Sequence, residues 1–284
     1  MSEDYAGATA RGVEFAAAVG CGSDSSAATA DCLRSLSTQD IIASGFVDRG
    51  PFRVIDGTIL SINTAEAIES GQFNKTPVMV GSNRDENTWF YSFTERDTGV
   101  VLSAADYPAA VEASFGVANA PSILAEYPLS DYPNPSNALT SAQTGNGFGC
   151  QPRRRGIKKL VAHVPVWAYT FTDRTAPNYF PPVSFNYWAA HTLELQFLFK
   201  EFKGAGGTLN KPLSHAQERL SDDMVSYWTQ FARTGNPNSR RTPYWRNYKL
   251  ANDNYQRLDL PRPSHFLGFA EQQKCDLWDA LSGE

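Results

Sequence analysis

The clearest pattern of hydrophobic and polar positions along this chain is an amphipathic helix over residues 214–233. Apolar side chains recur there at helical spacing, and Gly235 follows as a helix stop. Residues 9–20, 64–71 and 193–202 have similar patterns that are shorter or less regular. We therefore expect a chain with many helices.

Short apolar runs bounded by turn residues predict strands at residues 76–81, 164–171 and 255–260. Residues 52–60 have the pattern of a hairpin, with an Asp-Gly pair at its turn. Short strands that alternate with longer helices are typical of an α/β fold. Because so few strands are predicted, we expect only part of a central sheet, in a single partial domain over residues 1–284.

Candidate catalytic residues follow two of these predicted strands. Glu86 comes shortly after the strand at 76–81, and His191 lies in a loop after the strand at 164–171. Taken alone, such a Glu is more often a solvated loop acid and such a His more often structural. Together, an acid followed by a histidine is the chain order of hydrolases whose nucleophilic serine comes first. The sequence contains no Gly-x-Ser-x-Gly motif that would present this serine.

Composition narrows the class of protein. Hydrophobic residues make up 42% and aromatic residues 12% of the 284 residues, enough for a packed core. The net charge of −5 argues against a nucleic-acid binder, and the one basic cluster, residues 153–159, is expected to be a solvated helix face. No apolar run approaches the roughly 20 residues of a membrane helix. The acidic first residues do not form a signal peptide.

Four cysteines allow two disulfides. Cys21 and Cys32 flank a short loop rich in Gly, Ser and Ala, where a bridge would reduce the entropy of the unfolded chain. Cys150 and Cys275 remain as a second pair, and buried free thiols are the alternative. Paired cysteines without an export signal lead us to expect that an N-terminal part is missing.

Segments spread over nearly the whole chain occur together in the order of a known family. They are residues 32–36, 54–57, 70–81, 81–86, 165–171, 191–195, 227–238 and 275–278. The strongest is the segment at 81–86, Gly-Ser-Asn-Arg-Asp-Glu. The set resembles the C-terminal half of the type B carboxylesterases, the family of carboxylesterases and cholinesterases. The resemblance implies the C-terminal portion of an α/β-hydrolase fold, with an incomplete central sheet and many helices.

The resemblance also implies roles for individual residues. Glu86 stands where the family has its triad acid, and His191 where it has its general base. Glu194 is then a residue that supports the His191 loop, or simply the polar position of a helix. Thr192 departs from the family, which usually has Gly after this histidine. Residues 143–147 likewise lack an Asp that the family often has there.

The family further implies disulfides at Cys21–Cys32 and Cys150–Cys275, a secreted protein, a small-molecule ester as substrate, and no cofactor or metal. Several aromatic residues are candidates for lining an acyl or alcohol pocket, although core packing explains them equally well. They are Trp89, Phe90, Tyr179, Phe180, Phe185, Tyr187 and Trp188.

The family's nucleophile elbow and its glycine-rich oxyanion-hole segment have no counterpart in this sequence. Because the loss of even one oxyanion-hole donor lowers the rate by a factor on the order of 10²–10³, we expect negligible esterase activity from this chain alone. The expected function is that of a carboxylic ester hydrolase completed by an N-terminal half. The alternative is a catalytically inactive, hydrolase-like binding or interaction protein.

Overall fold

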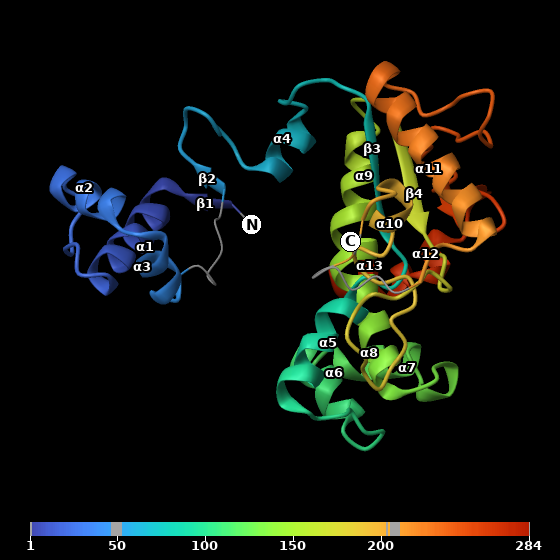
Figure 1. The fold of residues 1–284 in the computed structure, drawn as a ribbon, viewed down its shortest axis with the longest axis horizontal. Coiled ribbons are helices and arrows are strands. Elements are labelled where there is room, and N and C mark those ends of the chain that lie inside the picture. The colour runs from blue at the N-terminus through green and yellow to red at the C-terminus, as the bar shows by residue number, and fades with distance from the viewer. Residues whose placement is uncertain (1, 47–52, 203, 205–210, 284) are drawn as a thin grey trace. The chain divides into compact units, whose positions relative to one another are not determined.

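The computed structural model describes residues 2–46, 53–202, 204 and 211–283. The chain divides into two compact units, of which the first ends at Phe73 and the second begins at Asn74 (Figure 1). Each unit has its own strands and helices. The prediction of a single partial domain over residues 1–284 stays a prediction.

The first unit is mostly helical. Its helices are α1 (Tyr5–Ala18), α2 (Ala27–Ser35), α3 (Thr38–Ala43) and α4 (Thr64–Ser70). Short polar side chains cap all four, as Asp4 does by accepting the N–H of Gly7 at 2.7 Å. The Cys21–Cys32 disulfide joins the loop after α1 to α2 and confirms the predicted pair.

The loop inside this disulfide is organised by Asp24. Its carboxylate accepts the hydroxyl of Thr29 at 2.6 Å and the backbone N–H of Ser26 at 3.0 Å. These hydrogen bonds, that of Thr29 first, lower the pKa of Asp24 to about 2. The ionised carboxylate therefore favours the folded loop.

The hairpin predicted at residues 52–60 is wrong. The strand β2 (Arg53–Ile55) pairs in parallel with β1 (Ser2–Asp4), and residues 51 and 52 lie outside the described residues. The Asp-Gly turn is present, but the Asp56 carboxylate accepts the backbone N–H groups of residues 58, 59 and 60 at 2.8–3.0 Å. Those N–H groups are then unavailable to a returning strand. The turn is closed by the Asp56 side chain and by one backbone bond, from the Gly57 N–H to the Leu60 carbonyl at 3.2 Å, and the described residues form no hairpin ladder.

The second unit contains a sheet with the order β3-β4-β5-β6. Its strands are β3 (Val78–Asn83), β4 (Val166–Phe171), β5 (Tyr255–Leu258) and β6 (Ser264–Phe266), and only β6 is antiparallel to its neighbour. β3 and β4 pair from Val78↔Val166 to Asn83↔Phe171 and lie side by side in Figure 1. A Cβ on Gly81 would collide with Tyr169 of β4, so this pairing requires glycine.

The second unit also contains helices. They are α5 (Asn87–Thr98), α6 (Tyr107–Phe115), α7 (Ala120–Glu126), η2 (Leu129–Asp131), α8 (Pro135–Thr144), η3 (Gly145–Arg154), α9 (Arg155–Leu160), α10 (Leu195–Leu198), α11 (His215–Thr234), α12 (Phe269–Gln272) and α13 (Cys275–Leu281). The helix predicted at 193–202 is therefore much shorter than its apolar pattern, and η3 is a π-helix that continues α8.

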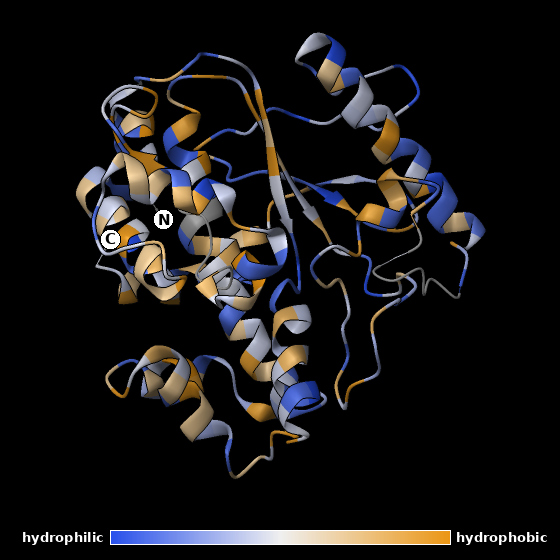
Figure 2. Ribbon diagram, turned by 60° about the vertical axis from the view of Figure 1, so that its left-hand side comes forward, coloured by the Kyte–Doolittle hydropathy of each residue, from blue (hydrophilic) through white to orange (hydrophobic). Residues whose placement is uncertain are grey.

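The core of this unit lies where α11 packs on the sheet. Leu220 and Met224 of α11 are fully buried in one cluster with Phe171 of β4. Along its length α11 has both hydrophobic and hydrophilic residues (Figure 2). Ser214 caps α11 in a capping box with Gln217, which explains why the predicted start was nearly correct.

Long-range bonds tie the C-terminal helix to the middle of the chain. The Cys150–Cys275 disulfide joins η3 to α13 and confirms the second predicted pair. Nearby, the guanidinium of Arg154 donates to Asp253 at 2.6 Å and to Asp279 at 2.7 Å.

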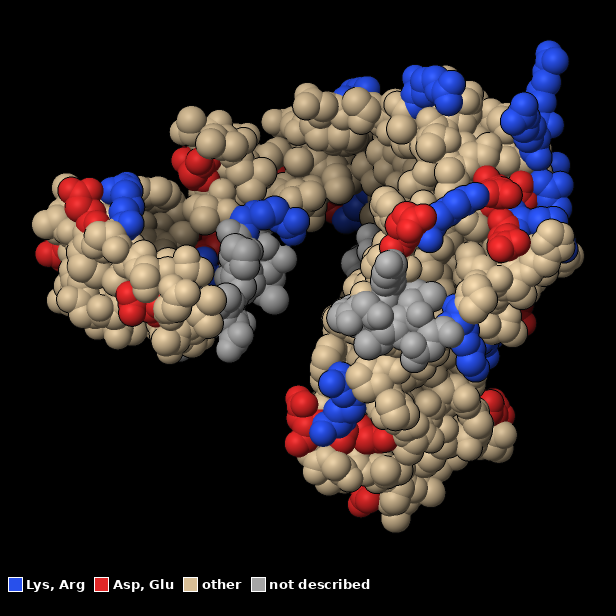
Figure 3. Space-filling model, viewed as in Figure 1, with Lys and Arg blue, Asp and Glu red and all other residues tan. Residues whose placement is uncertain are grey.

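Acidic and basic side chains are interspersed on the face shown in Figure 3. Among the described residues, no helix is both long and apolar enough to cross a membrane.

Candidate active site

Glu86 is held in the turn between β3 and α5. The backbone N–H of Arg84 donates to the carbonyl of Phe171 at 2.9 Å, and that of Asp85 to the carbonyl of Ala189 at 3.1 Å. These bonds fix the turn to the end of β4 and to the loop that carries His191. The Glu86 side chain is consequently buried, with 6% of its surface exposed.

The structure brings Glu86 and His191 together. The Oε2 atom of Glu86 lies 2.6 Å from Nδ1 of His191, although 105 residues separate them in the chain. The other oxygen, Oε1, accepts the backbone N–H of Asn83 at 2.8 Å. A carboxylate accepts hydrogen bonds only, so this contact selects the tautomer with the proton on Nδ1 and leaves Nε2 as the basic nitrogen. The His191 side chain is 37% exposed.

Asn83 connects this pair to Glu194. Its side-chain amide donates to the carbonyl of Ala190 at 2.7 Å and to the carboxylate of Glu194. Burial raises the pKa of Glu194, the hydrogen bond from Asn83 opposes that rise, and the nearby charge of Glu86 adds to it. Glu194 therefore contacts the residue that holds Glu86, and its supporting role in the site stays a prediction.

The loop around His191 has a left-handed residue. Thr192 has φ of +70°, a conformation that costs a β-branched residue more than glycine. The hydroxyl of Tyr179 lies 2.8 Å from the carbonyl oxygen of Thr192 and 2.9 Å from its Oγ1. The structure thus gives a physical reason for the glycine expected at this position, and shows what holds Thr192 in its place.

Aromatic rings form a wall beside His191. The centroids of Trp89 and Phe90 lie 5.4 and 4.9 Å from that of the imidazole, and that of Phe148 lies 6.2 Å away. Phe90 also stacks on Phe148 at 5.4 Å, and an open hollow of about 410 Å³ lies beside Phe90. The imidazole of His191 therefore lies beside three apolar rings.

The other predicted pocket aromatics lie in different places. Tyr179 and Tyr187 are buried in a small core with Leu193, against which Phe180 packs. Trp188 lies under the guanidinium of Arg174, 3.9 Å from it. Core packing, the alternative given for these residues, therefore describes several of them better than substrate contact does.

Comparison with known proteins decides the family. Residues 2–278 match the sequence model of the carboxylesterase family. The chain belongs to the carboxylesterase family. The predicted resemblance to type B carboxylesterases is therefore confirmed.

Two curated relatives are similar to this chain over most of its length. It is 26% identical over 288 residues to acetylcholinesterase of Bungarus fasciatus, covering 92% of the chain and 45% of the relative. It is 28% identical over 239 residues to cocaine esterase of Homo sapiens, covering 79% of the chain and 41% of the relative. The chain thus spans less than half the length of these curated relatives.

A solved structure of PNB esterase superimposes on 98% of the chain and on 55% of its own length, with a TM-score of 0.69 and 22% identity. This likeness shows the fold. The sheet and helices described above are therefore part of an α/β-hydrolase fold, as predicted.

Two residues of this candidate site were missed from the sequence. Asn83 lies inside the segment Gly-Ser-Asn-Arg-Asp-Glu, so its proximity to the acid was a usable signal. Phe148 has no such signal, because its contact with His191 depends on the path of the π-helix η3. In the described part of the chain, no group of three or more His, Cys, Asp or Glu side chains could hold a metal ion.

Proposed function

We propose that this chain supplies the acid and the general base of a serine carboxylic ester hydrolase. The observation that carries the proposal is the 2.6 Å contact between Glu86 Oε2 and His191 Nδ1 in a member of the carboxylesterase family. Glu86 orients the imidazole and stabilises its protonated form, and His191 moves the proton. Glu194 supports this arrangement through Asn83.

The proposed reaction needs a serine that this sequence does not present on an elbow motif. The serine hydroxyl attacks the ester carbonyl while Nε2 of His191 accepts its proton. His191 then gives this proton to the departing alcohol, and water releases the acid from the serine by the same route. Trp89, Phe90 and Phe148 support an ester with an apolar group beside the imidazole.

We propose that an N-terminal half carries the serine and the oxyanion hole. Among the described residues, β3 is paired on one side only, by β4, and its open edge is where a further strand could add. The coverage of 45% and 41% of the two curated relatives supports the same idea. Two disulfides support folding in an oxidising compartment, and hence secretion.

The alternative is a catalytically inactive binding protein built on the same fold. The missing Gly-x-Ser-x-Gly motif and the strained Thr192 beside His191 favour it. Both candidates give no turnover by the chain alone, so that measurement by itself does not separate them.

The separating experiment supplies the missing half. The chain is assayed for p-nitrophenyl ester hydrolysis alone and together with the polypeptide encoded directly upstream of it, using His191→Ala as the variant and the exposed His265→Ala as the matched control. Turnover that requires both polypeptides and His191 supports the hydrolase. An inactive mixture contradicts it and favours the binding protein. Activity retained in His191→Ala contradicts the proposed role of His191 as the general base.

A further inference from the structure

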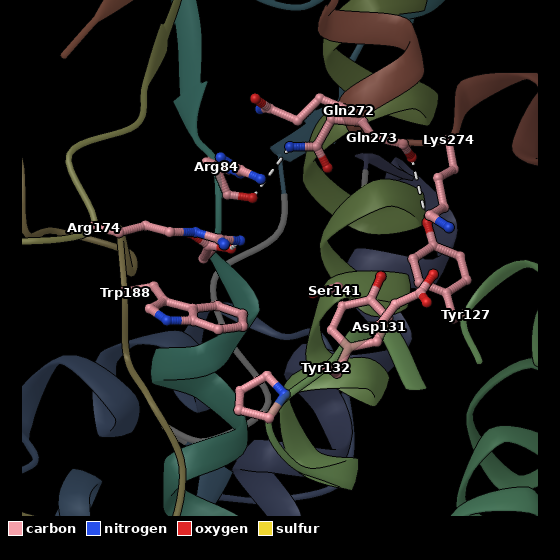
Figure 4. A pocket seen from close by; sticks show the side chains of 12 residues that line it. Arg84, Tyr127, Asp131, Tyr132, Ser141, Arg174, Trp188, Gln272, Gln273 and Lys274 are labelled. Atoms are coloured by element: carbon pink, nitrogen blue, oxygen red, sulfur yellow. Dashed lines mark hydrogen bonds and ion pairs between the residues drawn. The ribbon is translucent and has the colours of Figure 1, made fainter. Parts of the chain in front are cut away.

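A cavity of about 260 Å³ opens beside the turn after β3. Arg84, Arg174 and Gln272 are among the residues that line it, and Figure 4 shows the Arg174 side chain extending into it above the ring of Trp188. Glu86 and His191 do not line this cavity. A ligand bound in this cavity would therefore not contact the Glu86–His191 pair.

Arg174 is a rigidly held cation in this cavity. Its Nε and Nη2 atoms donate to the two oxygens of Asp85 at 3.0 and 2.6 Å, and its guanidinium lies 3.9 Å from the ring of Trp188. Asp85 is almost fully buried and also accepts the N–H of Ala189 at 3.2 Å. A guanidinium has more N–H donors than the two used here, so Arg174 can still donate to a ligand.

Arg84 is a second cation at the same cavity. Its side chain is half-buried, and burial lowers its pKa, with the neighbouring charge of Arg174 contributing in the same direction. The charges of Asp85 and Asp259 only partly oppose this. Among the residues that the structure describes, none forms a direct ion pair with the Arg84 guanidinium. Two neighbouring cations, one of them without such a pair, favour a bound anion.

A third observation comes from Gln272 at the end of α12. Its Nε2 atom is buried and has no hydrogen-bond acceptor among the described residues. Buried donors are nearly always satisfied in proteins, so this amide lacks an acceptor that the chain itself provides, although the buried Nε2 atom does not open onto the cavity as it stands. A rotation of the Gln272 side chain toward the cavity that it lines would give this amide an oxygen of a bound anion as its acceptor.

The rest of the lining limits the size and charge of the ligand. Lys274 adds a positive charge but is engaged with Glu126 at 3.4 Å and lies over the ring of Tyr127. Asp131 is exposed at the cavity and would repel a highly charged ligand. A volume of about 260 Å³ is below the range of drug-sized pockets, which begins at about 300 Å³.

We propose that this cavity binds a small oxyanion, the carboxylate or phosphate group of a small molecule, through Arg84, Arg174 and the Gln272 amide. Planar guanidinium groups bind both kinds of oxyanion through paired N–H donors. The inference does not depend on the ester-hydrolase proposal, because it uses neither the imidazole nor its carboxylate.

The test is calorimetric titration of the full 284-residue chain with sodium phosphate and with sodium acetate, at an ionic strength held constant with sodium chloride. We expect one site per chain, and a shift of the Trp188 indole N–H resonance at the same anion concentration. Arg84→Gln is expected to weaken binding about tenfold or more, since hydrogen bonds to charged groups are among the stronger ones. Arg96→Gln, the same change at an exposed arginine of α5, is the matched control.

Gln272→Glu is a second variant that tests the proposal if Arg84→Gln does not fold. It places a carboxylate in the cavity wall at the end of a short helix, and so should abolish anion binding while both arginines remain. Tighter binding of phosphate identifies a phosphate group, and tighter binding of acetate a carboxylate. The proposal is overturned if neither anion binds at millimolar concentration, or if Gln272→Glu binds as tightly as the unmodified chain.

Discussion

The substitution Glu86→Gln tests the proposed base most directly. One oxygen of Glu86 accepts the backbone N–H of Asn83 at 2.8 Å, and the other faces His191 Nδ1 at 2.6 Å. A glutamine in this position must keep its oxygen toward the fixed N–H of Asn83, because its NH₂ group there would oppose another donor. The NH₂ group then faces Nδ1 and favours the tautomer with the proton on Nε2, which cannot accept a proton from serine.

The expected effect on a completed enzyme is large. A serine protease whose triad acid is changed to its amide, with the geometry kept, loses on the order of 10⁴ in kcat, equivalent to about 5 kcal/mol of barrier. The same loss is expected here, with a much smaller change in KM, because the effect lies in proton transfer and not in substrate binding.

The tautomer can be measured without a nucleophile. Nitrogen-15 NMR of the imidazole should show the proton on Nδ1 in the unmodified chain and on Nε2 in Glu86→Gln. Glu95→Gln is the matched control, since Glu95 is a buried carboxylate that instead accepts hydrogen bonds from Ser184. If Glu86→Gln keeps the proton on Nδ1, or the completed variant keeps its kcat within about tenfold, the reasoning fails.

Three further predictions concern stability. Gly81→Ala should lower the free energy of unfolding by about 1–3 kcal/mol, because the added Cβ meets the neighbouring strand. Gly12→Ala is the control: a Cβ there meets nothing within 4 Å, so the free energy of unfolding should rise by up to about 1 kcal/mol in the same denaturation assay. Arg154→Ala should cost about 1–3 kcal/mol, because Asp253 and Asp279 lose their shared cation and keep only the Tyr248 hydroxyl and the Arg155 guanidinium as partners. The exposed Arg34→Ala should cost less than about 1 kcal/mol, and equal losses would contradict this. Asp24 has a pKa lowered from 3.8 to about 2, so its stabilisation of the disulfide loop should be complete above pH 4 and disappear as the pH falls toward 2. NMR of the loop amides measures this, and loop signals that are unchanged at pH 1.5 would refute it.

The parts of the fold that the sequence predicted are those set by local chemistry. The Ser214 capping box and Gly235 bounded α11 almost correctly, because caps and left-handed glycines act within one turn. β3 and β4 were found from apolar runs, and Glu86 and His191 from their order after these strands. Their contact follows because parallel strands end at the same edge of a sheet.

The parts that the sequence did not predict depend on distant residues or on competition between bonds. Asp56 took the backbone N–H groups that a hairpin would have needed. β6 was missed because its three residues form a strand only by pairing with β5. Phe148 reaches His191 through a π-helix whose neighbour, α13, is attached by the Cys150–Cys275 disulfide.

The pairing of β3 with β4 has a consequence for how this site can change over time. Asn83 is paired with Phe171, and the backbone N–H of the next residue, Arg84, donates to the Phe171 carbonyl. The position of Glu86 is therefore fixed by the register of β3 against β4. A single residue inserted into or deleted from β3 would move the turn by about 3.3 Å and reverse which face each side chain occupies. The carboxylate would then no longer reach the imidazole, and another residue would stand opposite Tyr169 in place of Gly81. Changes in the length of β3 therefore remove the acid–base pair in one step, whereas substitutions at its positions other than Gly81 and Asn83 leave the turn in place.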